Sequence, residues 1–512
     1  MTSPAQSTQV LVAVAPRRAR SSAVVALGLL ANALIGVGQS ILLTAFVGPG
    51  RYTDAFLAAY SVALPVVLLA STFRGQLVPL FGSADDEPSF RARAVEVCSR
   101  SVLLGMVMSG VLLATAPAAA LIVARGLPAD AQWTAFGALL ILGLSSYLQF
   151  RAAALSALLV GARRFDSSAA IYVVAGLVAL GASAIALPLI GAVGAAVGLF
   201  IGAAVLAVGH ERYARRFGVR LSVEARWLRE RAQLQLGLTL VGYASLGLAQ
   251  QLNLSLALGA VSGATGAITV YTFAFLCVLM LLNVTNVSLG LVLLPDLVES
   301  LGDGSPHAAA RHLARVSGFA LALLAPMLVG AVVYGKPLLE VVLGPLFDTA
   351  EIGLMADLIA LFCLLAIPTA LLQTGVTIAV AERRWRLTLA AAILSVAAQA
   401  ALTWTLDGEA PQTVAATHSA LAIATAALFL LALFGRRAGD AARRVGRPVI
   451  AAVGLSGLVA APRLLLGDQD AYAASAGLAM GIALYLIALW HAWPAVGRPL
   501  LARFGPMREL PR

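Results

Sequence analysis

The chain has 512 residues, of which 60% are hydrophobic and only 12% are charged, and its mean hydropathy is +0.92. An ordinary soluble domain carries about 25% charged residues, so this composition excludes a soluble enzyme. Apolar runs of about 20 residues or more, long enough to cross a hydrocarbon layer, recur along nearly the whole sequence. The sequence therefore predicts an all-α, polytopic integral membrane protein.

Apolar runs separated by charged, Gly or Pro breaks predict about fourteen transmembrane helices. Their ranges are 22–48, 53–82, 97–124, 133–161, 167–189, 191–210, 233–259, 265–295, 311–335, 352–380, 387–406, 412–435, 447–466 and 471–495. The count depends most on the tight connection at 189–191, around Pro188 and Gly191.

The net charge of +11 comes from short basic clusters that lie between the apolar runs. Most of the basic residues fall in segments that are cytoplasmic if both termini are cytoplasmic, and Arg51, Arg125, Lys336 and Arg463 fall in outer loops. This alternation follows the positive-inside rule, so it predicts a plasma-membrane protein and argues against nucleic acid as a partner. The basic segment 211–232 is either a helix lying on anionic inner-leaflet lipids or a solvated loop.

Three short matches at similar spacing indicate an internal duplication. Tyr52-Thr-Asp-Ala-Phe-Leu57 resembles Tyr271-Thr-Phe-Ala-Phe-Leu276, Val160-Gly-Ala-Arg-Arg-Phe165 resembles Val380-Ala-Glu-Arg-Arg-Trp385, and Pro79 corresponds to Pro295. We therefore expect two six-helix halves of the same orientation, related by a pseudo-two-fold axis, with a substrate path between them. A purely structural repeat is the alternative.

The duplication gives a division of the chain into six segments. We expect a cytoplasmic N-terminus (1–21), a first six-helix half (22–210), a basic cytoplasmic linker (211–232), a second six-helix half (233–435), two extra helices (436–495) and a cytoplasmic tail (496–512).

Charged residues inside a membrane cost roughly 2.5–3.5 kcal/mol each, so each of them needs a reason. Arg74, Arg151 and Asp357 remain inside predicted helices once the loops are assigned. The two arginines lie in the inner half of the first six helices, where their guanidinium groups either bind a phosphate or pyrophosphate or snorkel to the inner headgroups. Asp357 lies near the outer end of its helix, where we expect it to face water.

Polar uncharged residues gather on three of the predicted helices. They are Asn32, Gly36 and Gln39 in the first, Gln250, Gln251 and Asn253 in the seventh, and Asn283, Asn286 and Gly290 in the eighth. These side chains either join neighbouring helices or face a wet cavity and bind sugar hydroxyls, and the correspondence between helices one and seven favours the cavity.

The sequence carries no motif for catalysis, for a metal or for a cofactor. The five histidines and three cysteines are scattered without metal-ligand spacing, and no Gly-rich phosphate loop for ATP is present. We therefore expect a transporter that is driven by an ion gradient, the membrane potential or the lipid gradient.

Several short motifs, in order and at the right spacing, resemble those of the MurJ/MviN-type lipid II flippases of the multidrug/oligosaccharidyl-lipid/polysaccharide exporter superfamily. They are Asp54-Ala-Phe56, Leu77-Val-Pro79, Arg164-Phe165, Pro188-Leu-Ile-Gly191 with Gly194 and Gly198, Gln251-Leu-Asn253, Tyr271 and Leu293-Leu-Pro295. The resemblance covers about residues 22–435. The arginines that this family carries in helices one, two and eight are missing, whereas Asp54 is present.

The resemblance implies a bacterial flippase that moves a polyprenyl-pyrophosphate-linked cell-wall precursor from the inner to the outer leaflet by alternating access. We expect Arg74 and Arg151 near the phosphates, and Gln39, Gln251, Asn253 and Asn286 near the sugars, with Asn32 and Asp54 completing the site. Further partners are anionic inner-leaflet lipids and cell-wall synthesis proteins. The alternatives are an exporter of another lipid-linked polysaccharide intermediate, a cation-coupled drug or metabolite exporter, and a non-transporting cell-wall scaffold.

Overall fold

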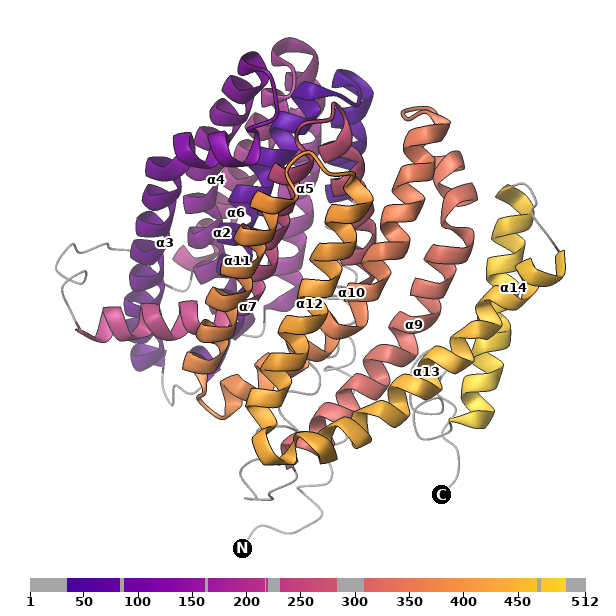
Figure 1. Cartoon of the computed structure of the whole chain (residues 1–512). Coiled ribbons are helices and arrows are strands. Elements are labelled where there is room, and N and C mark those ends of the chain that lie inside the picture. The colour runs from indigo at the N-terminus through magenta and orange to yellow at the C-terminus, as the bar shows by residue number, and fades with distance from the viewer. Residues whose placement is uncertain are drawn as a thin grey trace, which may run out of the picture. The chain divides into compact units, whose positions relative to one another are not determined.

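The computed structural model describes residues 35–82, 87–161, 164–216, 218–219, 231–282, 308–466 and 471–493, which are helices and short turns without any strand (Figure 1). The helices are α2 (Arg51–Gly82), α3 (Glu87–Val123), α4 (Ala129–Gly161), α5 (Phe165–Ile190), α6 (Val193–Arg215), α7 (Arg231–Val261), α9 (Ala308–Leu343), α10 (Thr349–Ala381), α11 (Trp385–Thr405), α12 (Pro411–Phe434), α13 (Ala438–Leu466) and α14 (Ala471–Ala492). A 3₁₀ turn, η2 (Gly435–Arg437), links α12 to α13. Two shorter apolar helices cover Ile35–Val47 and Ala267–Leu282.

The predicted class of fold, an all-α multi-pass membrane protein, is confirmed. Among the described residues, nine helical stretches are long and apolar enough to cross a membrane, and one of these stretches joins α12 to α13. The tight connection around Pro188 separates two helices, because Gly191 ends α5 with a φ of +62°, a conformation that only glycine adopts easily. The exact number of fourteen crossings stays a prediction.

The chain forms two compact units, Met1–Ala244 (unit one) and Ser245–Arg512 (unit two). Corresponding helices recur in both at similar offsets. The bounds of α4 and α10 differ by 220 positions at both ends, and both helices have 33 residues. Each ends in the same turn, in which the backbone N–H of Arg164 donates to Leu159 O and that of Arg384 donates to Ala379 O, both at 2.8 Å. The sequence matches at Val160 and Val380 therefore correspond to a repeated local structure.

In unit one, α5 and α6 pack closely because glycines recur at every fourth position of α6. A Cβ atom built on Gly198 would lie 2.7 Å from Ser183 N and 2.8 Å from Ala179 O, and one built on Gly194 would lie 2.5 Å from Ala186 C. Only glycine lets two helix backbones approach so closely, which is the small-residue packing typical of membrane helices.

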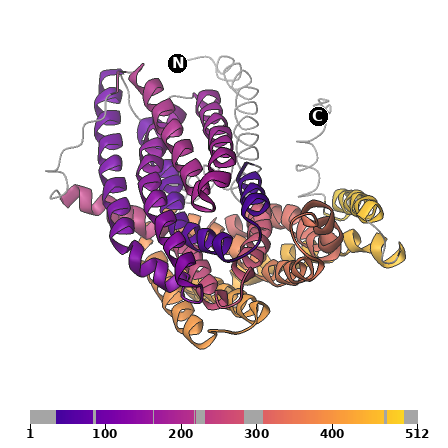
Figure 2. The ribbon, with the colours of Figure 1, turned by 90° about the horizontal axis from the view of Figure 1, so that it is seen from above.

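In unit two, α13 and α14 pack against α9, and they lie beside it in both views (Figures 1 and 2). Pro326 and Pro337 lie inside α9, and each lacks the N–H that would bond the carbonyl four residues earlier. Those carbonyls belong to Ala322 and Val333. The hydroxyl of Tyr485 on α14 donates to Ala322 O at 2.5 Å, and the guanidinium of Arg463 on α13 donates to Val333 O.

The two extra helices thus supply the donors that the prolines of α9 remove. This matters because an unsatisfied backbone group in a membrane interior costs several kcal/mol. Position 117 of α3, which corresponds to Pro337, is also a proline, whereas position 106, which corresponds to Pro326, is Met106. The proline that Tyr485 compensates is therefore specific to the second copy.

Candidate functional site

Arg151 lies on α4 and forms an ion pair with a residue of α6. Its Nη2 atom lies 2.6 Å from Glu211 Oε2, and the other carboxylate oxygen, Oε1, lies 2.8 Å from Arg215 Nη2. The side chains of Arg151 and Glu211 are 27% and 20% exposed, so the pair is partly screened from water. Arg151 Nε is buried and has no hydrogen-bond partner among the described residues. The three residues together carry one net positive charge, and one N–H of Arg151 has no acceptor within the described part of the chain.

Glu211 is not among the predicted site residues, although it is the single carboxylate in the arginine-rich stretch 211–216. Glu211 and Arg151 are 60 residues apart, so helical periodicity does not relate them. The ion pair forms because α6 packs against α4.

A hydrogen-bonded cluster of three side chains lies beside this pair and joins α4, α5 and α6. His210 Nδ1 lies 2.9 Å from Leu206 O, and since a carbonyl only accepts, Nδ1 carries the proton of the neutral ring. Its Nε2 then accepts from the hydroxyl of Ser168 at 3.2 Å, and Ser168 in turn lies 2.9 Å from the hydroxyl of Ser156. All three side chains are buried, so the cluster fixes the three helices around Arg151.

The other predicted site residues of unit one lie on its first helices. Asp54 is fully buried in the first turn of α2, where a carboxylate is stabilised by the helix dipole. Gln39 lies on the helix Ile35–Val47, and its Nε2 is buried without a hydrogen-bond partner among the described residues. Arg74 is in α2, eight residues before its end, and its side chain is outside the described part of the chain. Asn32, like Asn286 of unit two, lies outside the described residues.

In unit two, Asn253 of α7 joins a buried polar group that also includes residues of α11 and α12. Asn253 Nδ2 donates to Ser395 Oγ at 2.9 Å, and the hydroxyl of Thr425 lies 3.2 Å from the same oxygen. The amide oxygens of Gln251, Asn253 and Gln399 are buried and have no donor among the described residues. Three acceptors without donors suit a ligand that brings hydroxyl or amide protons. The sequence predicted Gln251 and Asn253 but missed the partner Ser395.

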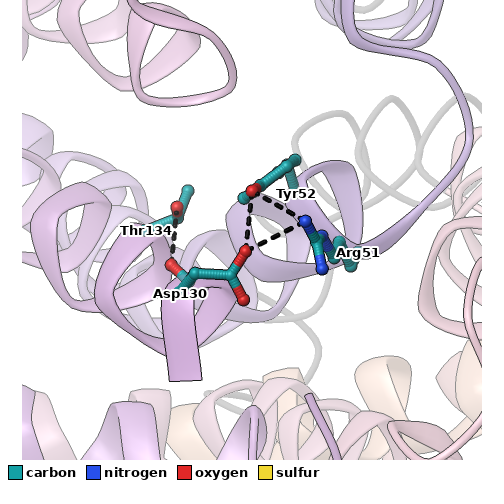
Figure 3. Close-up of polar contacts among 4 residues, drawn as sticks. All are labelled: Arg51, Tyr52, Asp130 and Thr134. Atoms are coloured by element: carbon teal, nitrogen blue, oxygen red, sulfur yellow. Dashed lines mark hydrogen bonds and ion pairs between the residues drawn. The ribbon is translucent and has the colours of Figure 1, made fainter. Parts of the chain in front are cut away.

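One polar cluster joins the first turns of α2 and α4 (Figure 3). Asp130 Oδ2 accepts from the hydroxyl of Tyr52 at 2.7 Å and lies 3.1 Å from Arg51 Nη2. The guanidinium of Arg51 also lies 4.8 Å from the centre of the Tyr52 ring. Arg51 and Asp130 are about half exposed, so their ion pair contributes little to stability and mainly fixes the two helix ends beside each other.

Within the part of the chain that the structure describes, no three His, Cys, Asp or Glu side chains come together as metal ligands. The described polar groups that lack a partner are the Nε of Arg151 in unit one and the amide oxygens of Gln251, Asn253 and Gln399 in unit two.

Comparison with solved structures identifies similar folds. The chain is similar to a structure named lipid II flippase MurJ, inward closed conformation, with a TM-score of 0.71 and 15% identity over 93% of this chain and 99% of that one. It is less similar to an inward-facing multidrug resistance MATE family transporter of the MOP superfamily (TM-score 0.58, 14% identity, 80% and 96% coverage). A MOP superfamily transporter from Pyrococcus furiosus is also similar (TM-score 0.54, 15% identity, 83% and 96% coverage).

No curated protein matches the chain in sequence. The model of the family described as lipid II flippase MurJ matches residues 43–484, which is well over half of the chain and covers most of each unit. The predicted family is thereby confirmed: the chain belongs to the MurJ family of lipid II flippases.

Proposed function

We propose that this protein is a lipid II flippase, which moves a polyprenyl-pyrophosphate-linked cell-wall precursor from the inner to the outer leaflet by alternating access. The observation that carries the proposal is the match of the MurJ family model across residues 43–484. It favours neither a drug exporter nor a scaffold without transport.

The direct test is to place the gene in bacteria whose own lipid II flippase can be switched off, and to measure lipid II that reaches the outer leaflet. We expect export and growth to be restored. Absence of export, with the protein verified in the membrane, would overturn the proposal.

For the binding residues, we propose that Arg151 contacts the phosphates and that Gln39, Gln251, Asn253 and Asn286 bind sugar hydroxyls. Arg74 is assigned to the phosphates, and Asn32 and Asp54 to the remaining part of the site. The unpaired Nε of Arg151 and the acceptors without donors at Gln251 and Asn253 support these roles.

Arg151→Ala is expected to lower the rate of lipid II export about tenfold to a hundredfold, because a hydrogen bond to a charged group contributes about 1.5–3 kcal/mol. Glu211→Gln, which removes the partner carboxylate but leaves the guanidinium, should keep most of the export. Arg215→Gln, which changes the charge of the same cluster by one unit, serves as the matched control. If Arg151→Ala exports lipid II at the wild-type rate, Arg151 does not bind the phosphates.

We further propose that both termini are cytoplasmic. The turns before α11 and α13 carry mainly arginines, whereas the turns at the opposite helix ends carry Asp348, Glu351, Asp407 and Glu409. This asymmetry supports the positive-inside orientation. If a cysteine is introduced into the N- or C-terminal segment of the protein, a membrane-impermeant thiol reagent added to intact cells should therefore fail to label it.

A further inference from the structure

Unit two gathers exposed arginines from two turns that are about fifty positions apart in sequence. The turn into α11 carries Arg383, Arg384 and Arg386, and the turn and first part of α13 carry Arg436, Arg437, Arg443, Arg444 and Arg447. All of them except Arg384, which is half-buried, are exposed. We call these eight residues the basic surface.

The side chain of Arg384 holds the two turns together. Its Nη1 donates to Leu433 O at 2.6 Å and its Nη2 donates to Ala432 O at 3.3 Å, so it caps the last carbonyls of α12 directly before η2. Within these two turns the sequence has two carboxylates. Glu382 lies 3.7 Å from Arg384, and Asp440 lies 2.9 Å from Arg444 Nε.

Eight arginines and two carboxylates therefore give these two turns a net positive charge of six. Arg436, Arg443 and Arg447 form no ion pair within the described residues. Guanidinium groups bind phosphate oxygens through paired hydrogen bonds, so the surface suits a phosphate-bearing partner.

The course of α13 and the side chains along it indicate what kind of phosphate-bearing partner fits the basic surface. The helix leaves the end of α12 and runs obliquely toward α14 (Figure 1). Ala441 and Val445 are buried, and Val445 belongs to the core of unit two, while Arg443 and Arg447 point outward.

The outward face changes its chemistry within one helical turn. Ile450, three residues after Arg447, is 75% exposed, and Val453 is 46% exposed. Three residues of helix span about 4.5 Å, so aliphatic side chains follow the guanidinium groups at once. A free phosphate or a soluble protein would need no such aliphatic continuation, whereas a lipid presents phosphate and hydrocarbon in this order.

We propose that the basic surface is a binding site for the headgroups of anionic phospholipids, and that their acyl chains lie along the exposed aliphatic face of α13 that begins at Ile450. The bound lipid holds the α12–α13 junction at the membrane interface.

The test uses the full-length protein in phosphatidylcholine vesicles, with and without phosphatidylglycerol, and measures the affinity for a fluorescent phosphatidylglycerol. The triple variant Arg436→Gln, Arg443→Gln and Arg447→Gln is expected to bind about a hundredfold more weakly, since each arginine near an anionic surface contributes roughly a factor of five. The matched triple lysine variant should keep most of the affinity. Asp440→Asn, which removes a carboxylate from the surface, should bind about fivefold more tightly.

The triple glutamine variant should bind the lipid more weakly and Asp440→Asn more tightly. Misfolding would weaken binding in both, so the opposite changes in affinity identify an effect of charge. A thermal unfolding curve of each variant serves as a second check. Unchanged affinity in the triple glutamine variant would overturn the proposal, as would equal binding of phosphatidylcholine. Displacement of the lipid by inorganic phosphate at a comparable concentration would also overturn it, because the site would then take free phosphate.

Discussion

Replacing Gly198 by valine is expected to destabilise unit one by about 3 kcal/mol or more, because the seam between α5 and α6 has no room for a side chain. A Cβ atom at this position would lie 2.0 Å from Ser183 Oγ, 2.7 Å from Ser183 N and 2.8 Å from Ala179 O. The hydroxyl can rotate away, but the two backbone atoms cannot. The helices would have to separate along the seam, and the contacts at Gly194 and Gly202 would be lost with them.

The measurement is the thermal unfolding temperature of the purified protein, together with lipid II export in cells. Gly181→Val is the matched control, because Gly181 lies on α5 and a Cβ atom there meets nothing within 4 Å. The control should unfold within a few degrees of the wild type. If the Gly198→Val protein unfolds at the wild-type temperature, α5 and α6 can accommodate the larger side chain without loss of stability.

The second large effect is expected at the prolines of α9. Tyr485→Phe removes the hydroxyl that donates to Ala322 O, and both residues are at most 2% exposed. The carbonyl then has neither the helical N–H, which Pro326 lacks, nor a side-chain donor. We expect a loss of about 1–3 kcal/mol in unfolding free energy, and a smaller loss for Arg463→Met, because the bond to Val333 O is only part-buried.

A double-mutant cycle tests the reason for this loss as well as its size. Pro326→Ala restores an N–H to α9 that can donate to Ala322 O, so in that background Tyr485→Phe should cost much less. Pro337→Ala should rescue Arg463→Met in the same way, and neither proline change should rescue the other residue. If Tyr485→Phe lowers the unfolding free energy equally with Pro326 and with Pro326→Ala, the hydroxyl does not act by satisfying the carbonyl of Ala322.

Much of the fold follows from hydropathy and charge, because a membrane helix must bury its backbone in a continuous apolar run. Each of the fourteen predicted ranges contains helix in the described residues. The helix ends differ more: α3 begins at Glu87 and α13 at Ala438, about ten residues before the predicted starts. Apolar runs mark only the part of a helix inside the hydrocarbon, and a charged extension remains helical outside it.

The candidate site was less predictable, for the same reason. The sixth helix was predicted to end at residue 210, but α6 continues to Arg215, where Arg212 and Arg215 suit the negative end of the helix dipole. This extension is what brings Glu211 to Arg151. Likewise Asn253 and Ser395 are 142 positions apart, and no periodicity relates them. Sequence identifies polar residues that need a partner, but packing decides which partner they find.

The dependence of α9 on α14 has a consequence for the order in which the protein is made. Ala322 and Tyr485 are separated by 163 residues. At about 5–20 residues per second, a ribosome needs roughly 10–30 seconds to reach the tyrosine after it has passed the alanine. During this interval the newly inserted α9 lacks the donor from α14 for a carbonyl inside the membrane. Completion of unit two is therefore delayed until α14 has been synthesised, and a chain that stops before Tyr485 lacks this donor for α9.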